Sequence, residues 1–332
     1  DVNGVAKGSS LRFGDTRLRA LDVIAGINNL DKPSGKLDVK AAGLTSGSAS
    51  YESINLQAEG SQASHRLTLR ATGAPANLVL QLDGSSNGGN WKGALKQLLL
   101  EARDVPTFNL AAPAQLAWDG KKFTASEICL VGDTTRLCIA GGGTAEGSID
   151  ARYRLEELPL ALITKLAASD TPIRATGTIG GSGIIQRTAK GVLSGNANIG
   201  SATGRIDWVG ADGAEPREML SYTAFAINAD LGTDATTATV KANLDHQGNI
   251  NGRIAINGPL EASSGLSGQL SMKLNSLEFI ELFTSEVVNV EGKVDADYSI
   301  AGTLGQPALN GALRLRDFAS EVPIAGLKLS NG

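Results

Sequence analysis

The stretch SHRLTLRA at residues 64–71 sets Leu67, Leu69 and Ala71 at every second position, with polar or charged residues between them. Strict alternation of this kind puts apolar side chains on one face of a β-strand and polar side chains on the other. The same pattern recurs in GKLDVKA at 35–41, ARYRL at 151–155, GRIAI at 252–256, KVDADYSIAG at 293–302 and ALRLR at 312–316. The sequence therefore predicts strands with one apolar face throughout the chain.

Turn-forming residues separate these alternating stretches at intervals of roughly 10–14 residues. Examples are DGSSNGG at 83–89 and HQGN at 246–249. Few strands are continuously apolar, which disfavours a parallel sheet buried under helices on both faces. We expect a run of antiparallel hairpins.

Two short stretches have apolar spacings closer to those of a helix. They are RLEELPLALITKLA at 154–167 and SLEFIELFTSEV at 276–287. Each is followed by a strand and then by a glycine-rich turn, GTIGGSG at 177–183 and AGTLGQP at 301–307. This order predicts two short helices and a divergent internal repeat, near 154–200 and 274–332.

Composition excludes several classes of protein. The chain has 332 residues, 41 glycines, 4% aromatic residues and a net charge of -4. Well-mixed charge gives no basic surface for nucleic acid. The longest apolar runs, such as residues 98–100, fall far short of the roughly 20 residues that span a bilayer. The chain opens at Asp1 without Met or a leader, and we expect a piece of a longer polypeptide.

A sheet with one apolar face must pack on another layer or curl on itself, and helices are too few to form a layer. We expect all-β structure: one long, twisted, mainly antiparallel sheet, continuous over residues 1–332 and curled into a U-shaped trough, with about 25 strands over about 120 Å. An apolar trough would hold acyl chains without gripping them, since roughly 0.8 kcal/mol accompanies each buried CH₂. The alternative is a closed core without ligand. Candidate lining residues are Leu37, Val39, Leu67, Leu69, Leu78, Leu80, Leu82, Tyr153, Leu155, Ile254, Ile256, Val294, Tyr298, Ile300, Leu313 and Leu315.

Cys129 and Cys138 are the two cysteines, in a hairpin expected over 127–140. If Asp133 and Thr134 form the turn, the two cysteines lie directly opposite one another, which suits a disulfide. A disulfide would place the protein outside the cytosol. Two free buried thiols are the alternative. The spacing fits neither a zinc site nor a redox CxxC motif.

No catalytic motif emerges from the sequence. The two histidines, His65 and His246, lie far apart, and we expect both to be solvated surface residues. GGGTAEG at 141–147 lacks the spacing and strand–helix context of a nucleotide-binding loop, and we expect a flexible turn there. Trp91, Trp118 and Trp208 are too far apart in the sequence to indicate a stacking platform. We expect no enzyme activity, no cofactor and no bound metal.

The stretch GTLGQPALNGALRLRDFASEVPIAGLKLS at 302–330 resembles a repeat of the TamB family, within the AsmA-like proteins of Gram-negative envelopes. NWKGALKQLLLEA at 90–102, FNLAAPAQLAWDGKKFTASEICL at 108–130 and RLEELPLALI at 154–163 are similar to a central TamB segment. The resemblance covers most of residues 90–332 and indicates a central or C-terminal periplasmic fragment. Residues 1–90 share the composition but carry no motif.

The resemblance implies a periplasmic protein anchored in the inner membrane, with a β-trough, often called a β-taco, that moves phospholipid between the two membranes. It also implies an outer-membrane partner, an Omp85-type barrel similar to TamA, bound through a C-terminal region absent here. A scaffold for assembly of outer-membrane proteins is the second function class. A third, an extracellular adhesin, would require aromatic or acidic ladders at a short period.

Overall fold

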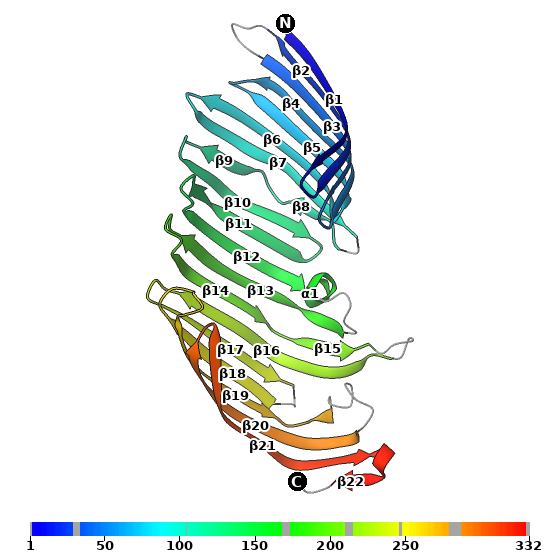
Figure 1. Ribbon diagram of the computed structural model, residues 1–332, viewed down its shortest axis with the longest axis vertical. Coiled ribbons are helices and arrows are strands. Elements are labelled where there is room, and N and C mark those ends of the chain that lie inside the picture. The colour runs from blue at the N-terminus through cyan, green and yellow to red at the C-terminus, as the bar shows by residue number, and fades with distance from the viewer. Residues whose placement is uncertain are drawn as a thin grey trace. The chain divides into compact units, whose positions relative to one another are not determined.

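The computed structural model describes residues 2–28, 34–103, 105–167, 173–209, 215–245, 248–278 and 287–329. Chain contacts divide the molecule into two compact units, unit 1 at Asp1–Tyr153 and unit 2 at Arg154–Gly332. Antiparallel strands make up nearly all of both units (Figure 1). The prediction of an all-β, antiparallel fold is confirmed.

Unit 1 is a succession of hairpins in which each strand pairs with the next. Its strands are β1 (Val2–Phe13), β2 (Thr16–Asn28), β3 (Ser34–Ser46), β4 (Ala49–Ser61), β5 (His65–Ala74), β6 (Ala76–Asn87), β7 (Asn90–Ala102), β8 (Phe108–Leu110), β9 (Ala114–Trp118), β10 (Lys122–Gly132), β11 (Thr135–Thr144) and β12 (Ile149–Pro159). The short strands β8 and β9 together fill one position between β7 and β10. β12 contains the boundary between the units.

Unit 2 repeats this plan after helix α1. It comprises α1 (Leu160–Ala167), β13 (Ile173–Arg187), β14 (Leu193–Ser201), β15 (Gly204–Trp208), β16 (Arg217–Leu231), β17 (Ala235–Leu244), β18 (Gly248–Asn257), β19 (Gly265–Leu274), β20 (Val288–Thr303), β21 (Gln306–Val322), a 3-10 turn (Pro323–Ala325) and β22 (Leu327–Leu329). β14 and β15 share the position between β13 and β16. No helix in the described ranges is long and apolar enough to cross a bilayer.

Several predicted turns are shorter than expected, because neighbouring strands extend the ladder into glycine-rich sequence. β6 continues to Asn87, so the turn is confined to Gly88 and Gly89, whose positive φ angles of 58° and 87° suit a two-residue hairpin. Residues 141–144 belong to β11, and GTIGGSG at 177–183 lies inside β13. The turn predicted at 177–183 is therefore wrong, and the turn predicted at 141–147 is confined to residues 145–147. Glycine permits reversal of the chain but does not impose it. The turn at 304–305 is confirmed.

The first predicted helix is also shorter than expected. Residues 154–159 continue β12, and α1 begins only at Leu160. The alternation in ARYRL carries the strand past Leu155. Strand pairing, and not the helical spacing of the next apolar residues, therefore determines the conformation of residues 154–159. Residues 279–286 of the second predicted helix and the predicted turn residues 246–247 lie outside the described residues.

Candidate apolar binding surface

In unit 1 the alternating residues form continuous apolar rows across the sheet. We call a row a set of residues that lie directly opposite one another on successive strands, and we name it after one member. The Leu67 row contains Ala25, Leu37, Ala58, Leu67, Leu82, Leu95 and Ala114. The Leu69 row contains Val23, Val39, Leu56, Leu69, Leu80 and Leu98. The Leu78 row contains Leu21, Ala41, Ile54, Ala71, Leu78, Leu100 and Phe108.

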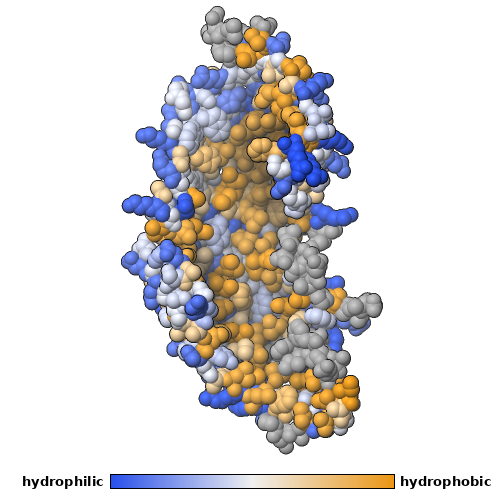
Figure 2. All heavy atoms as spheres, in the orientation of Figure 1, coloured by the Kyte–Doolittle hydropathy of each residue, from blue (hydrophilic) through white to orange (hydrophobic). Residues whose placement is uncertain are grey.

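The rows of unit 1 line an open hollow. Figure 2 shows hydrophobic atoms along the floor of this face, with hydrophilic atoms along its margins. All six members of the Leu69 row are half-buried. Side chains in a closed core are normally almost fully buried and interdigitate with a second layer. The rows therefore form a floor that still exposes apolar surface.

The structure brings together all seven unit 1 residues that the sequence proposed between Leu37 and Leu82. They lie in these three rows, although their strands were read separately from the sequence. Tyr153 and Leu155 lie on β12, half-buried and two positions apart, on either side of the boundary between the units.

Unit 2 carries the same arrangement over β16–β21. The Ile254 row contains Ala229, Ala238, Ile254, Gly268, Ile300 and Leu309, and the Tyr298 row contains Ile227, Val240, Gly252, Leu270, Tyr298 and Gly311. Residues of these two rows line a hollow of about 170 Å³. Two further rows lie toward the other end of the strands. They contain Ala242, Ile250, Met272, Ala296 and Leu313, and Leu244, Gly248, Leu274, Val294 and Leu315.

These last two rows of unit 2 are partly covered. Leu160 of α1 packs against Tyr222, Ala242 and Leu244. Leu277 is 4% exposed and packs in the cluster that contains Val294. Closed-core packing therefore occurs in part of unit 2, whereas Leu313 and Leu315, on the edge strand β21, are 55% and 42% exposed. Ile256, at the opposite end of β18, is only 6% exposed.

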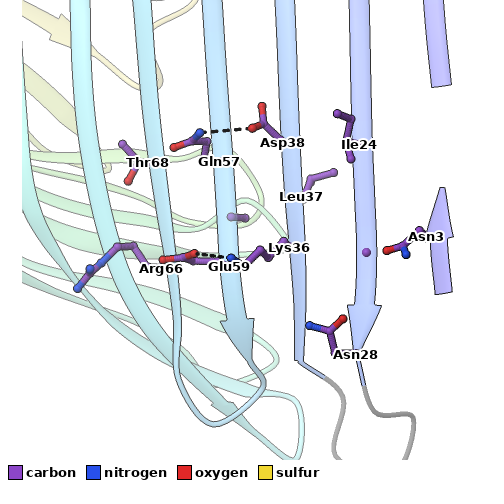
Figure 3. Close-up of a pocket in the computed structure, with 12 residues that line it drawn as sticks. Asn3, Ile24, Asn28, Lys36, Leu37, Asp38, Gln57, Glu59, Arg66 and Thr68 are labelled. Carbon is purple, nitrogen blue, oxygen red and sulfur yellow. Dashed lines mark hydrogen bonds and ion pairs between the residues drawn. The ribbon is translucent and has the colours of Figure 1, made fainter. Parts of the chain in front are cut away.

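The opposite face of the unit 1 sheet is polar. Lys36 lies 3.9 Å from Glu59, and Gln57 donates a hydrogen bond to Asp38 (Figure 3). Arg66 lies 2.8 Å from Asp83. The hydrogen bond from Arg66 holds the pKa of Asp83 below its usual range. A recess of about 480 Å³ lies on this face. Lys36, Glu59 and Arg66 are ion-paired across strands, a pattern that fixes strand register.

The disulfide joins Cys129 and Cys138, with an S–S distance of 2.09 Å, as predicted. Gly132 pairs with Thr135, so Asp133 and Thr134 form the turn. Leu130 lies opposite both Leu137 and Leu110, and Leu110 lies two residues after Phe108 of the Leu78 row, so these leucines are on the apolar face. Each cysteine is adjacent to one of these leucines in its strand and therefore faces the other way. The disulfide therefore lies on the polar side of the sheet.

Bulges concealed other members of the apolar floor from sequence reading. In β7 the register shifts between Leu95 and Gln97, so Leu95, Leu98 and Leu100 share a face despite uneven spacing. A second shift, between Ala125 and Ile128, has the same effect in β10. An extra residue in one strand breaks the period of two on which the prediction rests.

His65 is not the solvated surface residue that we expected. It is half-buried, and Trp91 Nε1 donates a hydrogen bond to His65 Nε2 at 2.8 Å. His65 Nδ1 lies 3.1 Å from the carbonyl oxygen of Ser61. Since the indole can only donate, Nε2 is the acceptor and Nδ1 carries the proton. His246 lies outside the described residues.

Comparison with known proteins shows the family of the chain. The model of the family described as TamB, N-terminal domain, matches residues 1–315. The chain belongs to the TamB family. The resemblance in the sequence pointed to a central or C-terminal segment, whereas the matched model describes the N-terminal domain of TamB proteins. A curated relative from Haemophilus influenzae, the translocation and assembly module subunit TamB, is 24% identical over 342 residues. That match covers 98% of this chain but about a quarter of the relative. No solved structure matches the chain.

Proposed function

We propose that this chain is a segment of a periplasmic lipid-transfer protein whose apolar rows carry phospholipid acyl chains between the inner and outer membranes. The observation that carries the proposal is the Leu69 row, six aliphatic side chains across six strands that are neither covered nor fully exposed. Acyl chains on such a floor would gain burial of CH₂ groups without meeting a polar group that holds them in one place. Movement along the rows would require only small changes in free energy.

The sixteen residues named from the sequence remain candidate lining residues under this proposal, with different weight. Leu67, Leu69 and Leu80 line the open floor, whereas Ile256 and Val294 are buried and have a packing role as well. We also propose that the floors of the two units join as one trough.

We also propose that this chain lies in the periplasm. The disulfide favours an oxidising compartment such as the periplasm. An inner-membrane anchor and the contact with an Omp85-type, TamA-like barrel would belong to the parent protein.

A scaffold for assembly of outer-membrane proteins is the second candidate. The name of the relative refers to translocation and assembly. Among the described residues, β1 pairs only with β2, and Gln306–Ala319 of β21 pair only with β20. Free strand edges can add a strand from another polypeptide. Crosslinking of an unfolded outer-membrane protein to β1 or β21, with no lipid found on the floor, would favour this candidate.

A matched pair of variants tests the lipid proposal. Leu69→Asp puts a carboxylate on the floor, and Thr68→Asp puts the same charge at the adjacent position, on the polar face of β5. We expect Leu69→Asp to reduce crosslinking to a photoactivatable phospholipid at least about tenfold, because a charge among acyl chains must be desolvated. Thr68→Asp should crosslink like the wild type.

The alternative of a closed core makes the opposite prediction for Leu69→Asp. A carboxylate in a closed core would unfold unit 1, and circular dichroism would show the loss of β structure. A folded Leu69→Asp variant that crosslinks lipid like the wild type would refute lipid conduction over this floor. Ile256 is unsuitable for this test because it is buried.

A further inference from the structure

Three aromatic residues form a row at one end of the unit 1 apolar face. Trp91 on β7 lies directly opposite Trp118 on β9, and Trp118 lies opposite Phe123 on β10. One strand, β8, lies between the two tryptophans in the sequence, which gives no sign of this arrangement. We call Trp91, Trp118 and Phe123 the aromatic row.

Trp91 is held in a fixed orientation. Its ring stacks near that of His65, with centroids 6.4 Å apart and planes inclined by 28°, and its N–H bonds to His65 Nε2. Gly84 and Gly93 pair beneath these rings. A Cβ atom at Gly84 would lie 2.7 Å from both Trp91 Nε1 and His65 Nε2. The bare backbone at this position is what makes room for the indole.

Polarity changes in order along β6, β7, β9 and β10. Leu95, in the Leu67 row, comes first, and Gly93 and then Trp91 follow at two-residue steps, so the aromatic row lies about 13 Å from the Leu67 row. Beyond Trp118 the chain turns through Asp119, Lys121 and Lys122, where the Asp119 carboxylate accepts hydrogen bonds from the backbone N–H groups of both lysines. The order is aliphatic, aromatic, charged, which is the polarity profile of a membrane interface.

We propose that the aromatic row seats the glycerol ester and phosphate region of a phospholipid whose acyl chains lie on the Leu67 and Leu69 rows. This inference rests on the proposed function and assigns the polar end of the ligand a place. Trp118 is half-buried, and its indole N–H can act only as a hydrogen-bond donor. It can donate to an ester carbonyl or a phosphate oxygen. Lys121 lies in the turn three residues beyond Trp118 and adds positive charge at this end of the strands.

The experiment compares two ligands with the same alkyl chain. Purified full chain is titrated with oleic acid, which lacks the glycerol ester and phosphate, and with dioleoyl phosphatidylglycerol. The variant Trp118→Leu/Phe123→Leu keeps apolar side chains that strands accept but removes both rings and the indole N–H. We expect phospholipid binding to weaken by roughly 5- to 100-fold and oleate binding to stay within twofold. Trp208→Leu, in unit 2, is the control and should change neither.

Each outcome is decisive. Retained oleate binding shows that the variant is folded, so equal phospholipid affinity in wild type and variant would overturn the aromatic seat and leave the proposed function standing. If the wild type bound neither ligand, the proposed function would fall and the seat with it.

Fluorescence gives a second readout in the Trp208→Phe variant, where the remaining tryptophans are Trp91 and Trp118. A nitroxide on the phospholipid headgroup should quench their emission more strongly than a nitroxide at the acyl chain end. Stronger quenching from the chain end would overturn the proposal.

Discussion

At the scale of single residues, the absence of a side chain can matter as much as its presence. Gly84 lies beneath the His65–Trp91 contact, where an added Cβ would be 2.7 Å from both hydrogen-bonded nitrogens. Its φ angle is not in the left-handed region. The backbone would thus accept alanine, and only the space above it is lacking.

We therefore expect Gly84→Ala to separate His65 from Trp91. Overpacking of this kind costs about 1–3 kcal/mol of folding free energy. Trp91 emission should shift to the red as the indole becomes more exposed, and the urea midpoint should fall. Gly4→Ala is the matched control, because a Cβ there meets nothing within 4 Å. Unchanged emission in Gly84→Ala would contradict the described contact.

Asp83 gives a residue-scale prediction on the polar face. Its folded-state pKa is lowered by the hydrogen bond from Arg66. A lowered pKa stabilises the fold above the unfolded-state value of about 4 and loses that contribution as pH falls through the folded-state pKa. Thermal midpoints of the wild type should fall below about pH 4, and Asp83→Asn should fall less steeply over the same range. Parallel curves from pH 7 to pH 2 would show that this pair makes no contribution.

At the scale of elements, the disulfide hairpin of β10 and β11 separates stability from the proposed binding. Cys129 and Cys138 lie on the polar side of the sheet, and their disulfide closes a short loop. Closing such a loop contributes roughly 2–3 kcal/mol to the free energy of unfolding in the chain-entropy model. We expect Cys129→Ser/Cys138→Ser to lose about this much in urea unfolding and to bind oleate like the wild type. Reductant should lower the wild-type midpoint and leave that of the variant unchanged. A large loss of oleate binding in the folded variant would show that the hairpin shapes the floor.

Element prediction from sequence succeeded where alternation is unbroken. The period of two in SHRLTLRA gives both the strand and its apolar face, and Leu67 and Leu69 lie where it predicts. It failed at bulges, since the register shift beside Gln97 moves Leu98 onto the face of Leu95. It also failed at residue 154, where a strand continues into a segment with helical spacing.

The aromatic row was beyond sequence reasoning for a different reason. Trp91 and Trp118 become neighbours only because β8 and β9 together occupy one position beside β7. Local propensity carries no information on such register, which depends on pairing between distant strands. The same holds for Leu160, which packs against the cluster of Tyr222 although three strands lie between them in the sequence.

At the scale of the whole molecule, half-buried rows in both units leave apolar surface that a ligand could cover. Burial of apolar surface raises the heat capacity change of unfolding, which is about 12–15 cal/mol/K per residue for compact proteins. The heat capacity change of unfolding of the delipidated protein should fall below this range.

Loading with phospholipid should raise both the heat capacity change and the midpoint. The gain in stability is about 2.7 kcal/mol when free lipid is 100 times the Kd. Calorimetry of delipidated and loaded protein measures both quantities, and Leu69→Asp should show little difference between the two states. Equal heat capacity changes in loaded and delipidated wild type would contradict the exposed floor.

The rows also make length an adjustable property. Each hairpin donates two side chains to every row it crosses, so removing β4 and β5 as a pair would shorten the Leu69 row by about 10 Å without exchanging the two faces. Inserting one residue within a strand would instead turn its apolar side chains toward the charged face. Evolution, or an engineer, can therefore change the reach of this protein in whole hairpins, while a single extra residue is accommodated only where a bulge absorbs it, as in β7 and β10.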